Sequence, residues 1–198
     1  LGPDFNSRII FNDREGDKFV SVILDIETGE RRIVPFPVYA VNPSGKFALS
    51  LDFSRLDRVR EGYGYKDGKS SNDEALFFSF DLDNPKNITK FHDGELHGQA
   101  LDYKDSEGEH WADHLTFNPK GDWFVFLHRQ ILTTGGFKSQ LYAVSSNQKI
   151  VLGTQKIILD TGMASHFTWE NDEEIAIWGR PPGLASVVGK SFLRKLLV

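Results

Sequence analysis

The chain has 198 residues, no cysteine, and 28 acidic against 23 basic side chains, which gives a formal net charge of −5. The lack of cysteine excludes a disulfide framework and a thiolate metal site, and the acidic balance argues against nucleic acid as a partner, since such binding normally needs a basic face. No apolar run reaches the length of a transmembrane segment, so we expect a soluble protein of the cytoplasm or the periplasm. Aromatic residues make up 13%, and 18 glycines and 8 prolines separate short apolar runs, which indicates many short strands and turns.

The first part of the chain alternates apolar and polar residues in three short runs. Asp13 to Asp17 reads as the first turn between them. Glu27-Thr28-Gly29-Glu30 reads as a hairpin turn, in which Gly29 can supply a positive φ. The predicted strands are residues 8–12, 18–26 and 31–34.

A unit made of a strand, a four-residue turn and a second strand then occurs three times. Val38, His114 and His166 open the three copies. The first two copies share an Asn-Pro-x-Gly turn, in which proline fixes φ at the second position of a type I turn and glycine closes it. The further predicted strands are residues 38–41, 47–53, 75–82, 87–91, 114–117, 123–129, 140–144, 149–152, 166–169 and 174–178.

Repeated units of about four short antiparallel strands predict an all-β chain with a β-propeller fold; a β-sandwich with similar hairpins is the alternative. Residues 1–180 would supply about three to four four-stranded blades, with an incomplete first and last blade, whereas propellers usually have about 4–8. We therefore expect a fragment of a larger propeller. Residues 181–198 are predicted to be a tail outside the blades. Apolar residues at helical spacing predict a helix there, either packed on the propeller or lying on a membrane surface.

One face of the predicted propeller carries the long connections. The start of a first strand and the end of the antiparallel second strand lie on this face, together with residues 54–73, 92–113, 130–138 and 153–165. Because long loops on a rigid scaffold often carry binding residues, we expect the ligand site here. Arginine forks match carboxylate or phosphate oxygens, and tyrosine rings offer flat apolar surfaces, a combination that suits an acidic sugar. The predicted ligand-binding residues are Arg55, Arg58, Tyr63, Tyr65, His97 and Arg129.

Histidines open two of the repeated units at equivalent positions. His114 and His166 should therefore lie on the same face and near each other, and His128 should join them from the end of the neighbouring strand. Imidazole nitrogens bind divalent metals such as Zn or Mn, and Asp113 could orient the ring of His114. The alternative is that these histidines are satisfied polar groups at strand ends. Trp123 and Trp169 are expected to be buried between blades.

The repeated strand and Asn-Pro-x-Gly units resemble those of TolB-type propellers over residues 8–178. Two stretches, His114 to Arg129 and Gly162 to Trp178, resemble oligogalacturonate lyases, whereas the segment from Ser50 to Tyr65 resembles uncharacterised bacterial relatives. The lyase resemblance implies a divalent metal (Mn, Ca or Zn) held by three histidines and a glutamine.

The histidines of this chain that match such ligands are His114, His128 and His166, while Met163 and Thr168 depart from the lyase pattern. Such a metal would neutralise a uronate carboxylate while a base removes the neighbouring proton. Two functions thus stay open: binding of an acidic oligosaccharide, with a lyase-like reaction if the chain is an enzyme, and non-catalytic docking of a protein partner on the same face.

Overall fold

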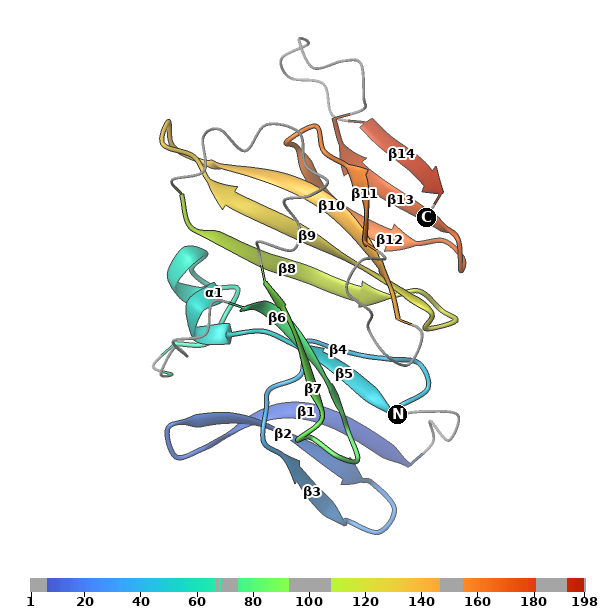
Figure 1. Ribbon diagram of the computed structural model, residues 1–198. Coiled ribbons are helices and arrows are strands. Elements are labelled where there is room, and N and C mark those ends of the chain that lie inside the picture. The colour runs from blue at the N-terminus through green and yellow to red at the C-terminus, as the bar shows by residue number, and fades with distance from the viewer. Residues whose placement is uncertain are drawn as a thin grey trace. The chain divides into compact units, whose positions relative to one another are not determined.

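The computed structural model describes residues 7–66, 68, 75–92, 108–146, 155–180 and 192–197. The chain forms two compact units, one up to His92 and one from Asp93 (Figure 1), and each is described by itself. In the described part of the chain all regular elements but one are strands, and all strand pairs are antiparallel. The predicted all-β class is therefore confirmed. Among these residues no helix is long and apolar enough to cross a membrane.

The first unit contains two sheets. One has the order β1-β2-β3, and the other has the order β4-β5-β6-β7. The first hairpin is longer than predicted, because β1 and β2 stay in register up to the pair of Glu15 and Lys18; the turn is only two residues long, with Gly16 at a φ of 61°. The strands are β1 (Arg8–Glu15), β2 (Lys18–Asp25), β3 (Arg31–Val34), β4 (Ala40–Val41), β5 (Phe47–Ser50), β6 (Ala75–Asp81) and β7 (Ile88–His92).

A helix, α1 (Phe53–Val59), follows β5 where the sequence predicted the end of a strand and an insertion. The Asp52 carboxylate caps it by accepting hydrogen bonds from the backbone N–H groups of Ser54 and Arg55, at 3.0 and 2.9 Å. Phe53 and Leu56 form its buried side. An aspartate followed by apolar residues three positions apart is a helix-start signal, so the sequence did contain a cue for this helix.

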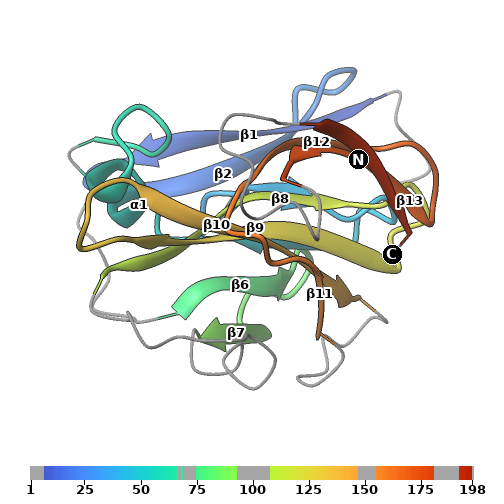
Figure 2. The ribbon, with the colours of Figure 1, turned by 90° about the horizontal axis from the view of Figure 1, so that it is seen from above.

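The second unit also contains two sheets, with the orders β11-β10-β9-β8 and β12-β13-β14. These sheets lie against each other through β10 and β12 (Figure 2). The strands are β8 (His110–Phe117), β9 (Trp123–Ile131), β10 (Phe137–Ser145), β11 (Gln155–Leu159), β12 (Ala164–Trp169), β13 (Glu174–Gly179) and β14 (Phe192–Leu197).

Several boundaries in this unit differ from the sequence prediction. Strand β8 begins at His110 instead of His114, and β9 and β10 extend into the predicted loop 130–138. The predicted strand 149–152 lies outside the described residues. In the tail, the predicted helix is wrong for Phe192–Leu197, because these residues form β14 and pair with β13.

Each unit has a core between its two sheets. In the second unit Leu127 and Leu141 pack with Ile175 and other apolar side chains of β13, whereas Trp123 and Trp169 are only partly buried at the margin of this cluster. The sequence predicted burial of the two tryptophans between blades; both pack against the core but are only partly buried. In the first unit Ile23 and Val34 of the first sheet pack with Phe80 of the second. Neighbouring sheets therefore pack face to face, as consecutive blades do.

The turns of the second unit are tied together by Asn118. Its Oδ1 accepts hydrogen bonds from the backbone N–H groups of Gly121 and Trp123 at 2.9 and 3.0 Å, which closes the β8–β9 turn. Its Nδ2 donates to the backbone carbonyl of Asp172 at 2.9 Å, and the Asp172 carboxylate accepts from the backbone N–H of Lys120 at 2.8 Å. The β12–β13 turn is thereby held against the β8–β9 turn.

The core of the second unit generates a test of stability. Leu127 is fully buried and Ile131, in the same strand, is 36% exposed. Leu127→Ala should lower the free energy of unfolding by about 2–5 kcal/mol because it removes packed methyl groups and leaves a cavity, and Ile131→Ala should cost far less. Urea denaturation followed by circular dichroism measures both changes. Equal costs for the two variants would contradict the assigned core.

Candidate functional site

Interruptions of strand pairing place His114 and His166 at equivalent points. The register between β8 and β9 shifts between Asp113 and Thr116, and that between β12 and β13 shifts between Ala164 and Phe167. At the first bulge His114 has a φ of 56°, a left-handed conformation that is uncommon for residues other than glycine and often marks functional sites. The two imidazole rings lie 6.3 Å apart between centroids, with their planes at 84°. We call these two residues the site pair.

Each ring of the site pair is held by the side chain that precedes it. The Nδ1 of His114 lies 2.8 Å from Oδ1 of Asp113, and the Nδ1 of His166 lies 3.0 Å from Oγ of Ser165. An ionised carboxylate can only accept a hydrogen bond, so Nδ1 of His114 carries the proton and donates it. In each ring Nε2 is then the nitrogen that the preceding side chain does not hold.

Asp113 is buried and accepts hydrogen bonds from three side chains. Besides His114, the Nε of Arg129 donates to Oδ1 at 2.9 Å and the indole N–H of Trp111 donates to Oδ2 at 3.1 Å. Burial by itself would raise the pKa of Asp113, but the hydrogen bond from His114 and the charge of Arg129 outweigh burial and lower the pKa to about 2. The carboxylate is therefore ionised at neutral pH and available to orient His114.

Arg129 lies behind the site pair. Its side chain is only 3% exposed, its Nη1 donates to the hydroxyl of Ser139 at 2.8 Å, and its guanidinium lies 4.8 Å from the ring centroid of Phe137. The sequence predicted Arg129 as a ligand-binding residue; these contacts give it the position of a support for Asp113.

His128 makes different contacts from those predicted. Its Nε2 lies 3.2 Å from Nδ1 of His110, its Nδ1 lies 3.4 Å from Oε1 of Gln140, and it is only 1% exposed. Within the described residues no three or more histidine, aspartate or glutamate side chains are grouped closely enough to hold a metal ion together. The structure thus brings His114 and His166 together without assembling the predicted three-histidine set. His97 lies outside the described residues.

The predicted arginines and tyrosines of residues 55–65 belong to the first unit. Arg55 is half-buried, and its Nη1 donates to the backbone carbonyl of Ala75 at 3.4 Å. Arg58 is exposed in the last turn of α1. Tyr63 is 47% exposed and stacks under the guanidinium of Arg60 at 3.5 Å. Arg58 and Tyr63 therefore lie at the surface, whereas Arg55 is half-buried.

Tyr65, in contrast, has a packing role. Its ring stacks on Phe53 at 4.5 Å with the planes at 8°, and its hydroxyl accepts a hydrogen bond from Nδ2 of Asn12 at 2.8 Å. Gly64 before it passes so close to α1 that a Cβ atom would lie 2.0 Å from the carbonyl oxygen of Phe53. The segment after α1 is thereby held against the helix.

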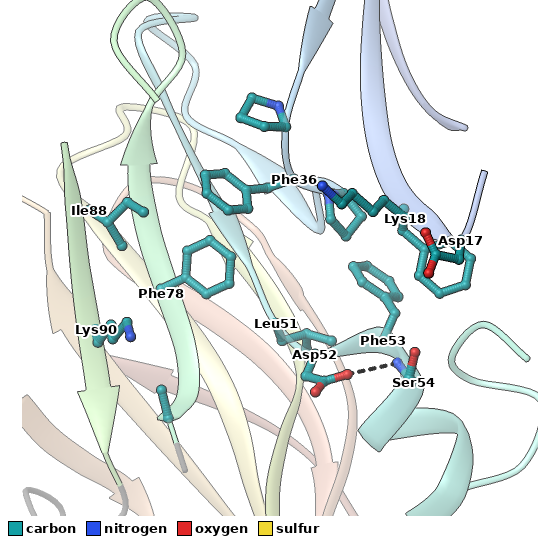
Figure 3. A pocket seen from close by; sticks show the side chains of 14 residues that line it. Asp17, Lys18, Phe36, Leu51, Asp52, Phe53, Ser54, Phe78, Ile88 and Lys90 are labelled. Carbon is teal, nitrogen blue, oxygen red and sulfur yellow. Dashed lines mark hydrogen bonds between the residues drawn. The ribbon is translucent and has the colours of Figure 1, made fainter. Parts of the chain in front are cut away.

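A pocket of about 530 Å³ opens in the first unit beside the start of α1 (Figure 3). Its size is in the range of small-molecule sites, and its lining is mostly apolar. The Asp52 carboxylate faces it but already caps α1. Sequence reasoning missed the pocket because its walls come from separate segments. They include Phe19, Phe36, Phe53 and Phe78 with Lys18 and Lys90.

Comparison with known proteins supports the fold alone. No protein family and no curated protein matches the chain. The crystal structure of TolB from Acinetobacter baumannii is similar over 96% of this chain, with a TM-score of 0.51 and 17% identity, and the chain spans 38% of that TolB's length. The crystal structure of a protein from Lactobacillus plantarum aligns with a TM-score of 0.37 and 13% identity; the alignment covers 100% of this chain and 57% of the Lactobacillus chain. The similarity to TolB confirms the predicted propeller fold.

The buried carboxylate generates a test by pH. Because the pKa of Asp113 is lowered from 3.8 to about 2 in the folded chain, its ionised form stabilises the fold above pH 3.8. This contribution should be lost as the pH falls through about 2. Asp113→Asn should remove this acid-dependent loss, and at pH 7 it should destabilise the chain by about 3–5 kcal/mol because Arg129 is left buried without its carboxylate.

Urea denaturation at several pH values between 2 and 7 measures this effect. Asp160→Asn, at an exposed carboxylate, is the control and should cost little stability at pH 7. A wild-type profile identical to that of Asp113→Asn would show that the Asp113 carboxylate does not stabilise the fold.

Proposed function

We propose that this propeller chain binds an acidic saccharide at the site pair, and that His114 and His166 together hold a carboxylate of the sugar. The observation that carries the proposal is the approach of two imidazoles at equivalent bulges of neighbouring sheets, with a ring separation of 6.3 Å. Each ring is held from behind at Nδ1, so both Nε2 atoms are the nitrogens suited to a common ligand.

The ring separation fits a shared oxygen better than a shared metal ion. Two imidazoles that donate to one oxygen at about 2.8 Å can have ring centroids up to about 8 Å apart, and 6.3 Å corresponds to a bent, ordinary arrangement. Two imidazoles on one metal ion, with bonds of about 2.0–2.1 Å, reach only about 6.5 Å even when they lie on opposite sides of the ion. A tetrahedral ion would need the rings about 1 Å closer.

The surroundings supply the other features of a sugar-acid site. The buried carboxylate of Asp113 lies directly behind His114 and accepts a hydrogen bond from its Nδ1, so Nε2 of His114 donates to a sugar carboxylate only when both ring nitrogens carry protons. The ring of Phe167 lies 6.3 Å from that of His114 and offers an apolar face against which a pyranose can stack. Asp113 and His114 lie on β8 and Phe167 lies on β12, in two neighbouring sheets of one unit.

A more specific version of this hypothesis is that the chain cleaves the bound saccharide in a metal-assisted lyase reaction. The residues brought together here are two histidines, and the third member of the predicted set, His128, contacts His110 and Gln140 instead. This donor set does not fit the predicted metal centre, so we derive no reaction step through a metal. If the chain were a lyase, incubation with polygalacturonate would generate unsaturated uronates with a new ultraviolet absorption.

Binding of a protein partner is the second candidate function. Exposed apolar side chains on the sheet β1-β2-β3 favour it. Phe11, Val22 and Ile33 lie in one row across β1, β2 and β3; Val22 in the middle is buried, while Phe11 and Ile33 on either side of it are 38% and 49% exposed. Ile9, two residues before Phe11, is 48% exposed. Exposed apolar side chains on one side of a sheet are typical of a surface that another protein covers.

The saccharide proposal predicts tighter binding of trigalacturonate than of neutral galactose oligomers, because hydrogen bonds from imidazole N–H groups to a carboxylate are charge-assisted. His166→Ala should weaken binding by about tenfold or more, the loss expected for a hydrogen bond to a charged group. Calorimetric titration measures the affinity, with Lys156→Ala in β11 as control and neutral galactose oligomers as the unrelated ligand. Equal binding of the neutral sugars, or binding that survives in His166→Ala, would contradict the proposal.

The second candidate predicts self-association of the isolated chain through the first sheet. Phe11→Glu should reduce it, because a charge replaces an exposed apolar side chain, while Thr28→Glu in the exposed β2–β3 turn should leave it unchanged. Analytical ultracentrifugation over a range of protein concentrations measures the association. A wild-type chain that stays monomeric throughout would argue against an adhesive surface at this sheet.

A further inference from the structure

A second pair of histidines, His110 on β8 and His128 on β9, lies on neighbouring strands of the β11-β10-β9-β8 sheet. His128 lies opposite Ala112 of β8 and opposite Gln140 of β10, and His110 lies two residues before Ala112, so the side chains of His110, His128 and Gln140 share one face of the sheet. The Nδ1 of His110 and the Nε2 of His128 are 3.2 Å apart. Their ring centroids are 5.2 Å apart with the planes at 21°.

We propose that His110 and His128 form a two-histidine binding site for a borderline divalent cation such as Zn²⁺. This site is separate from the site pair and does not depend on the proposed saccharide function. It would give the chain a metal site at residues that the sequence did not group together.

The dimensions of the pair match those of two imidazoles on one tetrahedral ion. With metal–nitrogen bonds of about 2.0–2.1 Å, the two ligating nitrogens lie about 3.3 Å apart and the two ring centroids about 5.3 Å apart. The observed separations of 3.2 and 5.2 Å agree with these values to about 0.1 Å. The site pair, with 6.3 Å between its centroids, does not.

The hydrogen bonds around the pair prepare His128 as a ligand. Its Nδ1 faces the side-chain oxygen Oε1 of Gln140, which can only accept a hydrogen bond. The proton of the neutral ring is therefore at Nδ1, and Nε2 carries a lone pair. Without metal, Nδ1–H of His110 donates to that lone pair. When an ion binds, His110 moves its proton to Nε2, so that both facing nitrogens ligate and no net proton is released. The contact with Gln140 is the outer-shell hydrogen bond that metal-bound histidines usually make.

The donor type selects the class of ion. Imidazole suits Zn²⁺, Cu²⁺ and Ni²⁺, whereas Ca²⁺ and Mg²⁺ prefer oxygen donors. His128 is buried and His110 half-buried, so an ion would approach from the His110 side and keep water in its remaining positions. We therefore expect moderate affinity, with Cu²⁺ above Zn²⁺.

The test uses the 198-residue chain, freed of any tag and dialysed against a chelator, and titrated with ZnCl₂ by calorimetry. Stoichiometric binding of one Zn²⁺ is expected. His110→Gln should remove saturable binding while circular dichroism shows an unchanged fold, since this residue is half-buried; the buried His128 is left intact for that reason. Gln140→Leu should weaken binding by about 10–100-fold. The matched control, His166→Gln, should bind Zn²⁺ like the wild type.

A direct readout complements the variants. The ring ¹⁵N resonances of His110 and His128 should shift on addition of Zn²⁺, whereas those of His114 should not. Zinc binding that is lost in His166→Gln and kept in His110→Gln would overturn the proposal in favour of the site pair. The absence of saturable binding up to millimolar Zn²⁺ would overturn it as well.

Discussion

The buried carboxylate of Asp113 is the interaction on which the second unit's geometry depends. A carboxylate without solvent exposure is costly unless its lone pairs are satisfied, and here three donors, on Trp111, His114 and Arg129, satisfy it. Arg129 in turn is held by Ser139, so one charge network joins β8, β9 and β10. The left-handed conformation of His114 persists because this network holds its ring, in the way that a strained backbone is kept where its surroundings determine it.

A second constraint relates neighbouring sheets. The side chain of Asn118 closes one turn and also binds the backbone of the next sheet's turn at Asp172. Because the β8–β9 turn and the β12–β13 turn are fixed to each other, β8 and β12 have a defined position relative to each other. The bulge in β8 and the bulge in β12 therefore come close together. The short separation of His114 and His166 therefore follows from pairing and turn chemistry, with no direct bond between the two residues required. A ligand that bridges them would find both rings already positioned, which lowers the entropy cost of binding.

The β8–β11 sheet uses its two faces for different chemistry. Before the bulge, Trp111 and Asp113 point to one face, with Arg129, while His110 and Ala112 share the other with His128 and Gln140. The first face supports the site pair and the second carries the other histidine pair. Strict alternation along β8 separates the residues that support the site pair from the second histidine pair, although they are only a few positions apart, and the bulge at His114 ends that alternation.

The sequence by itself determined the all-β class, the repeated turns and the equivalence of His114 and His166. These features depend on local rules: the two-residue period of strands, the turn chemistry of Asn-Pro-x-Gly and the spacing of a repeat. It did not determine where strands begin in polar segments, so β8 was placed four residues late and the contact of His110 with His128 was missed. It also could not separate helix from strand at Phe192–Leu197, because a short apolar run fits both until a neighbouring strand such as β13 offers its unpaired edge. Only the tertiary structure decided that Arg129 is a buried support and that His128 faces His110, because burial and side-chain partners depend on segments distant in sequence.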